Sequence, residues 1–276
     1  MIKLEKTQVV GLEPAIRGMR NPLNSWAKSD SVFDIETYLD EDCGWHWHGV
    51  DINLNTVHDT EDSRTPFTHN FVGPNDLDLM KRLAKNGPVH AKYRRMIVVY
   101  VDITAPLYWW KEFDTYKVGT VANSCSTMHR IHANGFTLDD FSCEHLMRIT
   151  NCGDDWHEIT IDGCGFMASA QGILCLVIDV LNYYRKKFLE TKDKKYWWQM
   201  IQLLPSSYNQ KRTVMLNYEV LAGIYPMRKD HKLDEWHTFC DWIRELPYSE
   251  LITGEEESAL MYTYNHSGEN KSGKED

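Results

Sequence analysis

Two polar side chains at a fixed interval in the C-terminal third of the sequence could form a ligand site. Asn217 and Arg228 lie eleven residues apart. This interval is close to three turns of an α-helix and predicts that both face one side of a continuous helix. Gly223 between them would let another backbone or a flat ring approach the helix. Pro226 is expected to kink or end the helix just before Arg228. The alternative is an Asn that caps or bridges helices and an Arg on the surface.

A second candidate site is the polar stretch over residues 117–129. Its side chains are small, so its backbone N–H groups can approach a ligand closely. Ser124, Cys125 and Ser126 stand together in this stretch. Cys125 could act as a thiolate nucleophile, whereas an inert buried thiol is the structural alternative. For the stretch as a whole, the alternative is an ordinary polar surface loop.

Histidines form a weaker signal. In the run Trp45-His46-Trp47-His48, the two histidines are two residues apart and no acidic or thiol partner stands in fixed register with them. This spacing is poor for a metal ion, so we expect no metal site. A solvent-facing insertion, or a lid that stacks on a ring, is the expectation for this run.

The stretch from Pro205 to Arg228 resembles the flavin-dependent thymidylate synthases. In that family a Leu-Pro pair is followed by an Asn and then by an Arg, and the intervals from Pro205 to Asn217 to Arg228 match this pattern. The resemblance implies that Asn217 lies by the flavin and that Arg228 holds the pyrimidine nucleotide. A guanidinium suits that role because it can grip a pyrimidine edge or a phosphate with two hydrogen bonds.

The signature loop of the family is altered in this sequence. Residues 101–112 resemble the strand, the Ala-Pro pair and the helix that lead into the loop, and residues 83–90 resemble a Gly-x-x-x-His turn with one residue fewer. In an ungapped alignment, Thr115-Tyr116-Lys117 replaces Arg-His-Arg, Thr120 and Cys125 replace two serines, and Thr127-Met128 replaces Arg-Tyr. With one inserted residue, Asn123 matches a frequent Asn, Ser126 matches the second Ser, and Met128-His129 fills the last pair.

Both alignments lose two or three arginines that serve the flavin and the substrate phosphate in the family. His129 and Arg130 could supply replacement charge. The resemblance implies a catalytic role for Cys125, Ser126 and Arg228. It implies nucleotide binding by Glu112, Ser124, Cys125, Ser126, Arg130 and Arg228, and flavin binding by His90, Thr115, Tyr116, Lys117, Thr120, Asn123 and Asn217.

The implied reaction is transfer of a one-carbon unit from methylenetetrahydrofolate to C5 of a deoxypyrimidine monophosphate, as from dUMP to dTMP, with FAD and NADPH as further cofactors. The implied assembly is a homotetramer whose sites form between subunits. A cytosine nucleotide is an alternative substrate, to be methylated or hydroxymethylated. Glu112 stands where the family has Gln, and a carboxylate accepts from an exocyclic amine. Two further hypotheses are a non-catalytic nucleotide- or flavin-binding module and an unrelated helical interaction protein.

These groups must be positioned by a chain that is rich in helices. The β-branched run over residues 96–103 predicts a strand that ends at Ala105-Pro106. We expect an α+β fold, a helix-rich single domain with a small sheet that the resemblance implies is mostly antiparallel. The domain is expected over residues 1–252, with an insertion at about 30–75 and a flexible acidic tail over 253–276. The periodicity predicts helices over residues 75–86, 107–116, 167–189, 195–203, 209–225 and 234–246.

Composition narrows the partners and the compartment. The net charge of −10 argues against binding to duplex nucleic acid, which requires many phosphates to be neutralised. The seven cysteines are odd in number and lack C-x-x-C spacing, as expected for reduced thiols. The N-terminus lacks an apolar signal segment, and the longest apolar stretch, residues 172–181, is too short to span a bilayer. We therefore expect a cytoplasmic protein with small-molecule partners and no membrane contact.

Overall fold

A four-stranded sheet forms the centre of the protein. The computed structural model describes residues 2–37, 67–147, 157–161 and 163–255. The strand order is β1-β4-β8-β5, and each neighbouring pair is antiparallel. The bounds are Lys3–Val10 for β1, Val98–Pro106 for β4, Asn209–Asn217 for β8 and Val121–Ser124 for β5. The predicted α+β fold with a small antiparallel sheet is confirmed.

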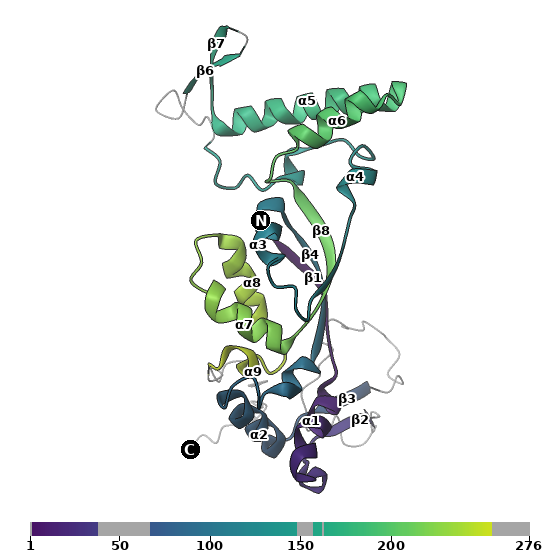
Figure 1. The fold of residues 1–276 in the computed structure, drawn as a ribbon, viewed down its shortest axis with the longest axis vertical. Helices are drawn as coiled ribbons and strands as arrows, with labels where there is room; N and C mark the ends of the chain where they lie inside the picture. The colour runs from purple at the N-terminus through teal and green to yellow at the C-terminus, as the bar shows by residue number, and fades with distance from the viewer. Residues whose placement is uncertain (1, 38–66, 148–156, 162, 256–276) are drawn as a thin grey trace, which may run out of the picture.

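Three helices cover one face of this sheet. They are α3 (Leu107–Phe113), α7 (Tyr218–Arg228) and α8 (Asp234–Arg244), and they lie to one side of the strands in Figure 1. Alternate residues of β4 point into the main core, including the buried Val99, Val101 and Ile103. Opposite them the helices contribute an aromatic cluster, with the ring of Trp109 centred 5.0 Å from Phe113 and 4.8 Å from Trp236.

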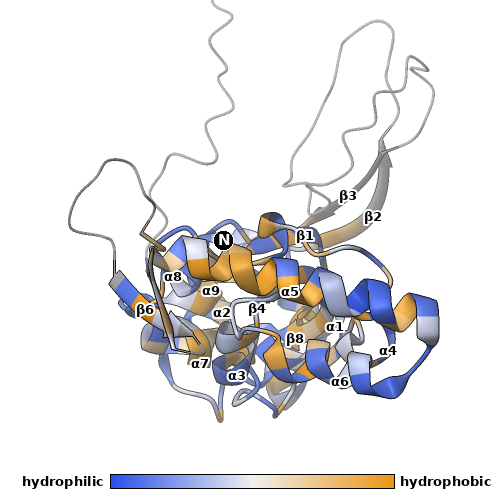
Figure 2. Cartoon of the chain, turned by 90° about the horizontal axis from the view of Figure 1, so that it is seen from above, coloured by the Kyte–Doolittle hydropathy of each residue, from blue (hydrophilic) through white to orange (hydrophobic). Residues whose placement is uncertain are grey.

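A second hydrophobic cluster lies at one end of the sheet, where α5 (Ala170–Thr191) and α6 (Lys194–Leu203) cross it (Figure 1). α5 begins at Ser169, whose hydroxyl accepts from the backbone N–H of Gly172 at 3.1 Å. Hydrophilic and hydrophobic residues both occur along α5 (Figure 2), as in an amphipathic helix. The buried residues of this cluster are Ile131, Phe136, Phe141, Leu174, Ile178, Leu181 and Met200.

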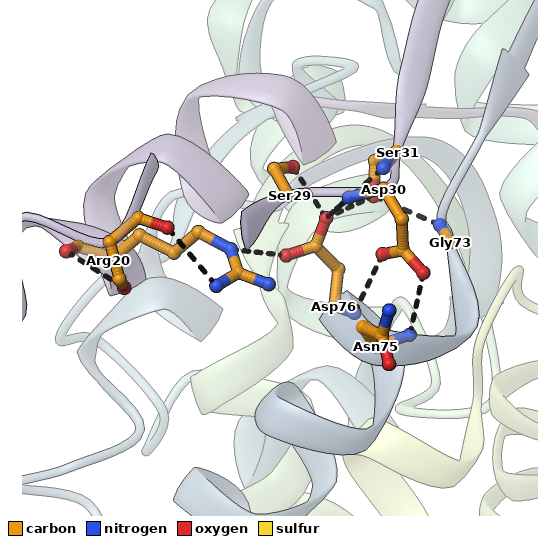
Figure 3. Close-up of polar contacts among 8 residues, drawn as sticks. Arg20, Ser29, Asp30, Ser31, Gly73, Asn75 and Asp76 are labelled. Carbon is orange, nitrogen blue, oxygen red and sulfur yellow. Dashed lines mark hydrogen bonds and ion pairs between the residues drawn. The ribbon is translucent and has the colours of Figure 1, made fainter. Parts of the chain in front are cut away.

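At the other end of the sheet, a buried ion pair fastens several segments to α2 (Pro74–Lys85) (Figure 3). The carboxylate of Asp76, which is fully buried, accepts from Arg20 Nε at 2.6 Å. The hydroxyls of Ser29 and Ser31 also donate to it, each at 2.6 Å. Burial by itself raises the pKa of Asp76, but these hydrogen bonds and the charge of Arg20 outweigh it and hold the pKa below its usual value.

The other elements of this end and of the periphery are short. α1 (Leu12–Arg20) follows β1, and β2 (Val32–Thr37) pairs with β3 (Phe67–Phe71). A second hairpin joins β6 (His157–Ile161) to β7 (Cys164–Ala168), and Thr127–Arg130 forms α4. Glu250–Thr253 forms α9, and four 3-10 helices cover Asn21–Leu23 (η1), Trp26–Lys28 (η2), Lys92–Arg95 (η3) and Leu138–Asp140 (η4).

The structure corrects one predicted helix. The predicted helices at 75–86, 107–116, 167–189, 195–203 and 234–246 correspond to α2, α3, α5, α6 and α8. The helix predicted over residues 209–225 is wrong in its first half, because Asn209–Asn217 is strand β8 and the helix begins at Tyr218. Gln210, Val214 and Leu216 are buried on one face of β8, which is the alternation of a strand. Pro226 lies inside α7, near its end, and the helix continues to Arg228.

Three expectations fall wholly or largely on parts of the chain that lie outside the described residues. They are the Trp45-His46-Trp47-His48 run, most of the predicted insertion at about 30–75 (residues 38–66), and nearly all of the predicted tail (residues 256–276). Within the described part of the chain, no three His, Cys, Asp or Glu side chains group as a metal site would require. No helix in that same part is both long and apolar enough to cross a membrane.

Candidate functional site

Arg228 lies at the centre of a polar cluster at the carboxyl end of α3. Its Nη1 donates to Glu112 Oε2 at 2.6 Å, and its Nε donates to the hydroxyl of Tyr116 at 2.8 Å. The guanidinium also lies over the ring of Trp236, 4.5 Å from its centre. Trp236 Nε1 donates to the same Glu112 oxygen at 3.0 Å, and His231 Nε2 lies 3.4 Å from it.

Two turns of the chain bring these residues together. Pro106 starts α3 directly after β4, so Glu112 projects from the end of the first helix that covers the sheet. Asn217 starts α7 directly after β8, and its Oδ1 accepts from the N–H of Val220 at 3.0 Å. β4 and β8 are neighbouring antiparallel strands, and the helices that follow them both contribute side chains to the same core on one face of the sheet. The last residue of α7, Arg228, thereby reaches Glu112.

The loop over residues 114–120 packs against the start of α7. Gly119 has φ +79°, and a Cβ at this position would lie 3.0 Å from Val220 Cγ2 and 3.1 Å from Asn217 Nδ2. The hydroxyl oxygen of Thr120 is buried and has no hydrogen-bond partner among the described residues. A buried hydroxyl without a partner is costly, so it marks a place where a bound group could supply one.

Cys125 belongs to a different group of contacts, at the other end of β8. Its N–H donates to the carbonyl of Lys211 at 2.9 Å, and its carbonyl accepts from Gln210 Nε2 at 2.8 Å. Gln210 Oε1 in turn accepts from Arg212 Nε at 3.1 Å. Arg212 Nη1 donates to Asp114 at 2.7 Å, and its guanidinium lies over the ring of Trp110 at 4.0 Å. The Cys125 side chain itself is exposed.

The remaining predicted site residues lie on the surface. The hydroxyl of Ser126 caps α4 and lies 2.7 Å from Nδ1 of His129. Thr115 Oγ1 donates to the carbonyl of Glu112 at 2.7 Å. His90 forms a turn with Gly87 through its backbone N–H at 3.0 Å. Exposed side chains belong to His90, Thr115, Lys117, Asn123, Ser124, Cys125 and Arg130.

Within the protomer, the predicted residues therefore fall into groups. Arg228 contacts both Glu112 and Tyr116, whereas Asn217 meets the 114–120 loop. The backbone N–H of Cys125 donates to Lys211, which lies six residues before Asn217 on β8. Along an extended strand, six residues place Lys211 about 20 Å from Asn217. Adjacent residues of a strand point to opposite faces, so Asn123 and Ser124 of β5 cannot serve one protomer's site from the same side.

The end of α3 lies between the two arginines. Glu112 bonds to Arg228, and Asp114, two residues later, bonds to Arg212. The β5 residue paired with Arg212 is Ser124. The Arg228 cluster and the Ser124–Cys125 segment are therefore joined through one helix end, although the structure gives no direct contact between Arg228 and Cys125 among the described residues.

Four residues of this arrangement are not expected from the sequence: Trp110, Arg212, His231 and Trp236. The predicted helix over 209–225 includes Arg212, so its strand partners cannot be inferred from that pattern. As a strand, Gln210, Arg212, Val214 and Leu216 alternate toward the same face as α3. That alternation is the signal that points to Arg212.

The cluster around Arg228 can offer a ligand both a donor and an acceptor. Among the described residues, Nη2 of Arg228 and Oε1 of Glu112 have no hydrogen-bond partner, whereas Nη1 and Oε2 bond to each other. The side chain of Arg228 is 16% exposed and that of Glu112 is 35% exposed. A planar ring that carries adjacent donor and acceptor groups is complementary to such a pair.

Comparison with known proteins identifies the fold. No protein-family model matches the sequence, and no curated protein does. A thymidylate synthase X (ThyX) structure from Helicobacter pylori, solved with FAD and dUMP, matches with 12% identity and a TM-score of 0.54, over 92% of this chain and 98% of that chain. The UMP/dUMP methylase PolB from Streptomyces cacaoi, bound with 5-Br dUMP, matches with 12% identity and a TM-score of 0.51, over 92% and 94%. A second Helicobacter pylori ThyX complex is described as a flavin-dependent thymidylate synthase, with a TM-score of 0.53. At low sequence identity, this chain has the fold of the flavin-dependent thymidylate synthases.

Proposed function

We propose that this protein is a flavin-dependent enzyme that transfers a one-carbon unit to C5 of a deoxypyrimidine monophosphate, as in the conversion of dUMP to dTMP. The observation that carries the proposal is the cluster of Glu112, Tyr116 and Arg228 beside the 114–120 loop, on a fold whose solved examples include complexes with FAD and dUMP. Methylenetetrahydrofolate is the proposed carbon donor and NADPH the proposed reductant. We expect the reaction in the cytoplasm.

In this proposal the residues around Arg228 bind the pyrimidine. Tyr116 and Glu112 hold the guanidinium in one orientation, so that Nη2 can donate to a ring carbonyl. A donor held at that oxygen stabilises negative charge on the activated ring, the form in which C5 is nucleophilic toward the carbon donor. Ser124, Cys125, Ser126 and Arg130 are proposed to meet the nucleotide from a second subunit.

FAD is the proposed cofactor, and when bound in reduced form it supplies the hydride. Asn217 Nδ2 and the unpartnered hydroxyl of Thr120 fit a hydrogen-bonding planar group at the 114–120 loop. Lys117 provides a cation on the same loop, and its exposure leaves it free to reach a phosphate. His90, Thr115 and Asn123 complete the proposed flavin contacts, whereas Tyr116 is assigned to the pyrimidine side because its hydroxyl bonds to Arg228.

A cytosine nucleotide is the second candidate substrate, because Glu112 is a carboxylate with one oxygen open. Oε2 is occupied by Arg228 and Trp236, and Oε1 is available to accept. An ionised carboxylate can only accept, so it suits the exocyclic amine of cytosine. It suits the N3–H of uracil as well, so the preference between the two bases requires measurement.

Exposed apolar side chains on the sheet face opposite the main core support the proposed homotetramer. Across the strands, Tyr100 pairs with Gln8 and Met215, and Met215 pairs with Val121. Tyr100 is 42% exposed even though it lies on a central strand, β4. Val121, on the edge strand β5, is 61% exposed. Tyr100, Met215 and Val121 thus form a short apolar strip across three strands, as is typical of a surface that another subunit covers.

The proposal is tested by assaying the purified protein with FAD, NADPH, methylenetetrahydrofolate and either dUMP, UMP or dCMP. Mass spectrometry of the nucleotide identifies a methyl or hydroxymethyl product, and light scattering gives the oligomeric state. Product from dUMP alone supports the proposal and excludes the cytosine alternative. Flavin absorbance with no product from any nucleotide indicates the non-catalytic module, and the absence of both flavin and nucleotide binding contradicts the proposal.

A further inference from the structure

A cavity lies away from the Arg228 cluster, between α2, η3, α7 and α9. Its volume is about 520 Å³, which is the size range of small-molecule sites. Lys81 and Lys85 of α2 line it on one side, with Arg94 of η3. Glu250 and Ile252 of α9 line it on another.

The cavity and the proposed flavin loop lie on opposite sides of α7. Val220 faces the loop, since its Cγ2 lies 3.0 Å from the position of a Cβ on Gly119. Ala222, two residues later, lines the cavity. Two residues correspond to a turn of about 200° around an α-helix. The cavity therefore does not belong to the site described above.

The walls of the cavity carry buried charged atoms that lack partners. The side chain of Glu250 is only 4% exposed, and although Oε1 lies 3.2 Å from Lys81 Nζ, Oε2 has no hydrogen-bond partner in the described part of the chain. Nε of Arg94 is also buried and unpartnered among those residues. The nearest carboxylate to Arg94, Glu219, is 3.8 Å from Nη1, beyond good hydrogen-bond distance.

Unpartnered buried charges need an explanation, and a bound polar molecule provides one. Here the open atoms are one donor, Arg94 Nε, and two acceptors, Glu250 Oε2 and Glu219 Oε2. Of these three residues, Arg94 and Glu250 line the cavity. Lys85 adds an exposed cation on the side of Arg94. A purely anionic ligand would be repelled by Glu250 and Glu255, and a purely cationic one by the three cations of the lining, Lys81, Lys85 and Arg94.

We propose that this cavity binds a small zwitterion with an ammonium and a carboxylate on one short carbon skeleton, as in an α-amino acid. The ammonium donates to the carboxylate of Glu250, and the ligand's carboxylate accepts from the guanidinium of Arg94 and from Lys85 Nζ. Ala84, Ala222 and Ile252 form the apolar part of the wall and can receive an aliphatic side chain. The site is independent of the proposed flavin chemistry, because it uses none of the same residues.

The test is a thermal-shift screen of the full chain against the twenty common amino acids, followed by calorimetry. For an amino acid that binds, we expect its N-acetyl form and its amide form to bind at least about tenfold more weakly, or about 1.4 kcal/mol. Glu250→Gln and Lys85→Gln should each weaken binding of the free amino acid by a similar factor. Arg82→Gln is the matched control, since Arg82 is an exposed residue of α2 paired with Asp78.

Glu250 is buried and paired with Lys81, so its variant is first checked for folding by circular dichroism. If Glu250→Gln does not fold, Lys85→Gln gives the same comparison, because the Lys85 side chain is exposed. The proposal is overturned if no amino acid shifts the melting temperature or produces heat on titration, which would mean that water alone fills the cavity. It is also overturned if the blocked forms bind as tightly as the free amino acid.

Discussion

Glu112 Oε2 lies 2.6 Å from Nη1 of Arg228, so the arginine proposed to hold the pyrimidine is already paired with a carboxylate. The pair joins the end of α3 to the end of α7 and lies over Trp236. A carboxylate at this position lowers the positive charge available to an anionic nucleotide, while it keeps the guanidinium plane fixed. The identity of residue 112 should therefore influence both affinity and the choice of base.

The first prediction is that Glu112→Gln shifts the preference from dCMP toward dUMP. Glutamine can both donate and accept hydrogen bonds, whereas a carboxylate only accepts. Loss of the Glu112 carboxylate also leaves the positive charge of Arg228 available to the nucleotide. We expect the ratio of the two dissociation constants to change by about tenfold, or about 1.4 kcal/mol, measured by calorimetry. Glu13→Gln, at an exposed site in α1, is the control. An unchanged ratio would show that Glu112 does not contact the base.

The main features of the fold could be predicted because their patterns are unambiguous. The β-branched run of β4 is buried at alternate positions, and α5 repeats its apolar residues at helical spacing. The Asn217–Arg228 interval predicts a continuous helix between the two residues, and α7 runs from its cap, Asn217, to Arg228. Asn217 is the cap that starts α7 and not a residue of a helix that begins at 209.

Strand β8 could not be predicted because its inward face carries polar residues. Gln210 and Arg212 point toward α3, where their groups are paired with Cys125, Asp114 and the ring of Trp110. A core-facing Arg breaks the apolar alternation that marks a strand, and only the tertiary partners make it acceptable. These partners are distant in sequence, so the site cannot be recognised without the fold.

The second prediction concerns Tyr116, whose hydroxyl accepts from Nε of Arg228 at 2.8 Å. Tyr116→Phe removes this hydrogen bond to a charged group, which contributes about 1.5–3 kcal/mol. We expect weaker nucleotide binding by at least about tenfold, with little change in flavin affinity. Fluorescence titration of flavin and calorimetry of nucleotide separate the two. Tyr183→Phe, at an exposed ring on α5, is the matched control. Equal losses for both ligands would argue against this assignment.

The third prediction concerns Gly119, where positive φ and close packing coincide. Gly119→Ala places a methyl group 3.0 Å from Val220 and 3.1 Å from Asn217 Nδ2. We expect a loss of about 1–3 kcal/mol in the free energy of unfolding, together with weaker flavin binding. The control is Gly163→Ala, where φ is +82° but nothing lies within 4 Å of the added carbon. If both variants bind flavin as the parent protein does, the 114–120 loop is not the flavin site.

The fourth prediction concerns the buried pair of Asp76 and Arg20 (Figure 3). Asp76→Asn leaves Arg20 without its counter-charge, which should lower the free energy of unfolding by about 3–5 kcal/mol in urea denaturation. Asp78→Asn, which breaks an exposed pair with Arg82 on the same helix, should cost less than about 1 kcal/mol.

This pair also predicts a dependence on pH, because the folded protein holds the pKa of Asp76 below its ordinary value of 3.8. Above that value the carboxylate is ionised in both states, and its full stabilisation is present. As the pH falls, the unfolded chain takes up the proton first, so the stabilisation decreases and is lost as the pH passes through the folded-state pKa. The stability difference between the parent protein and Asp76→Asn should therefore be constant at neutral pH and shrink below about pH 4. A difference that stays constant down to about pH 3 would mean that the ionised form of Asp76 is not what stabilises this end of the protein.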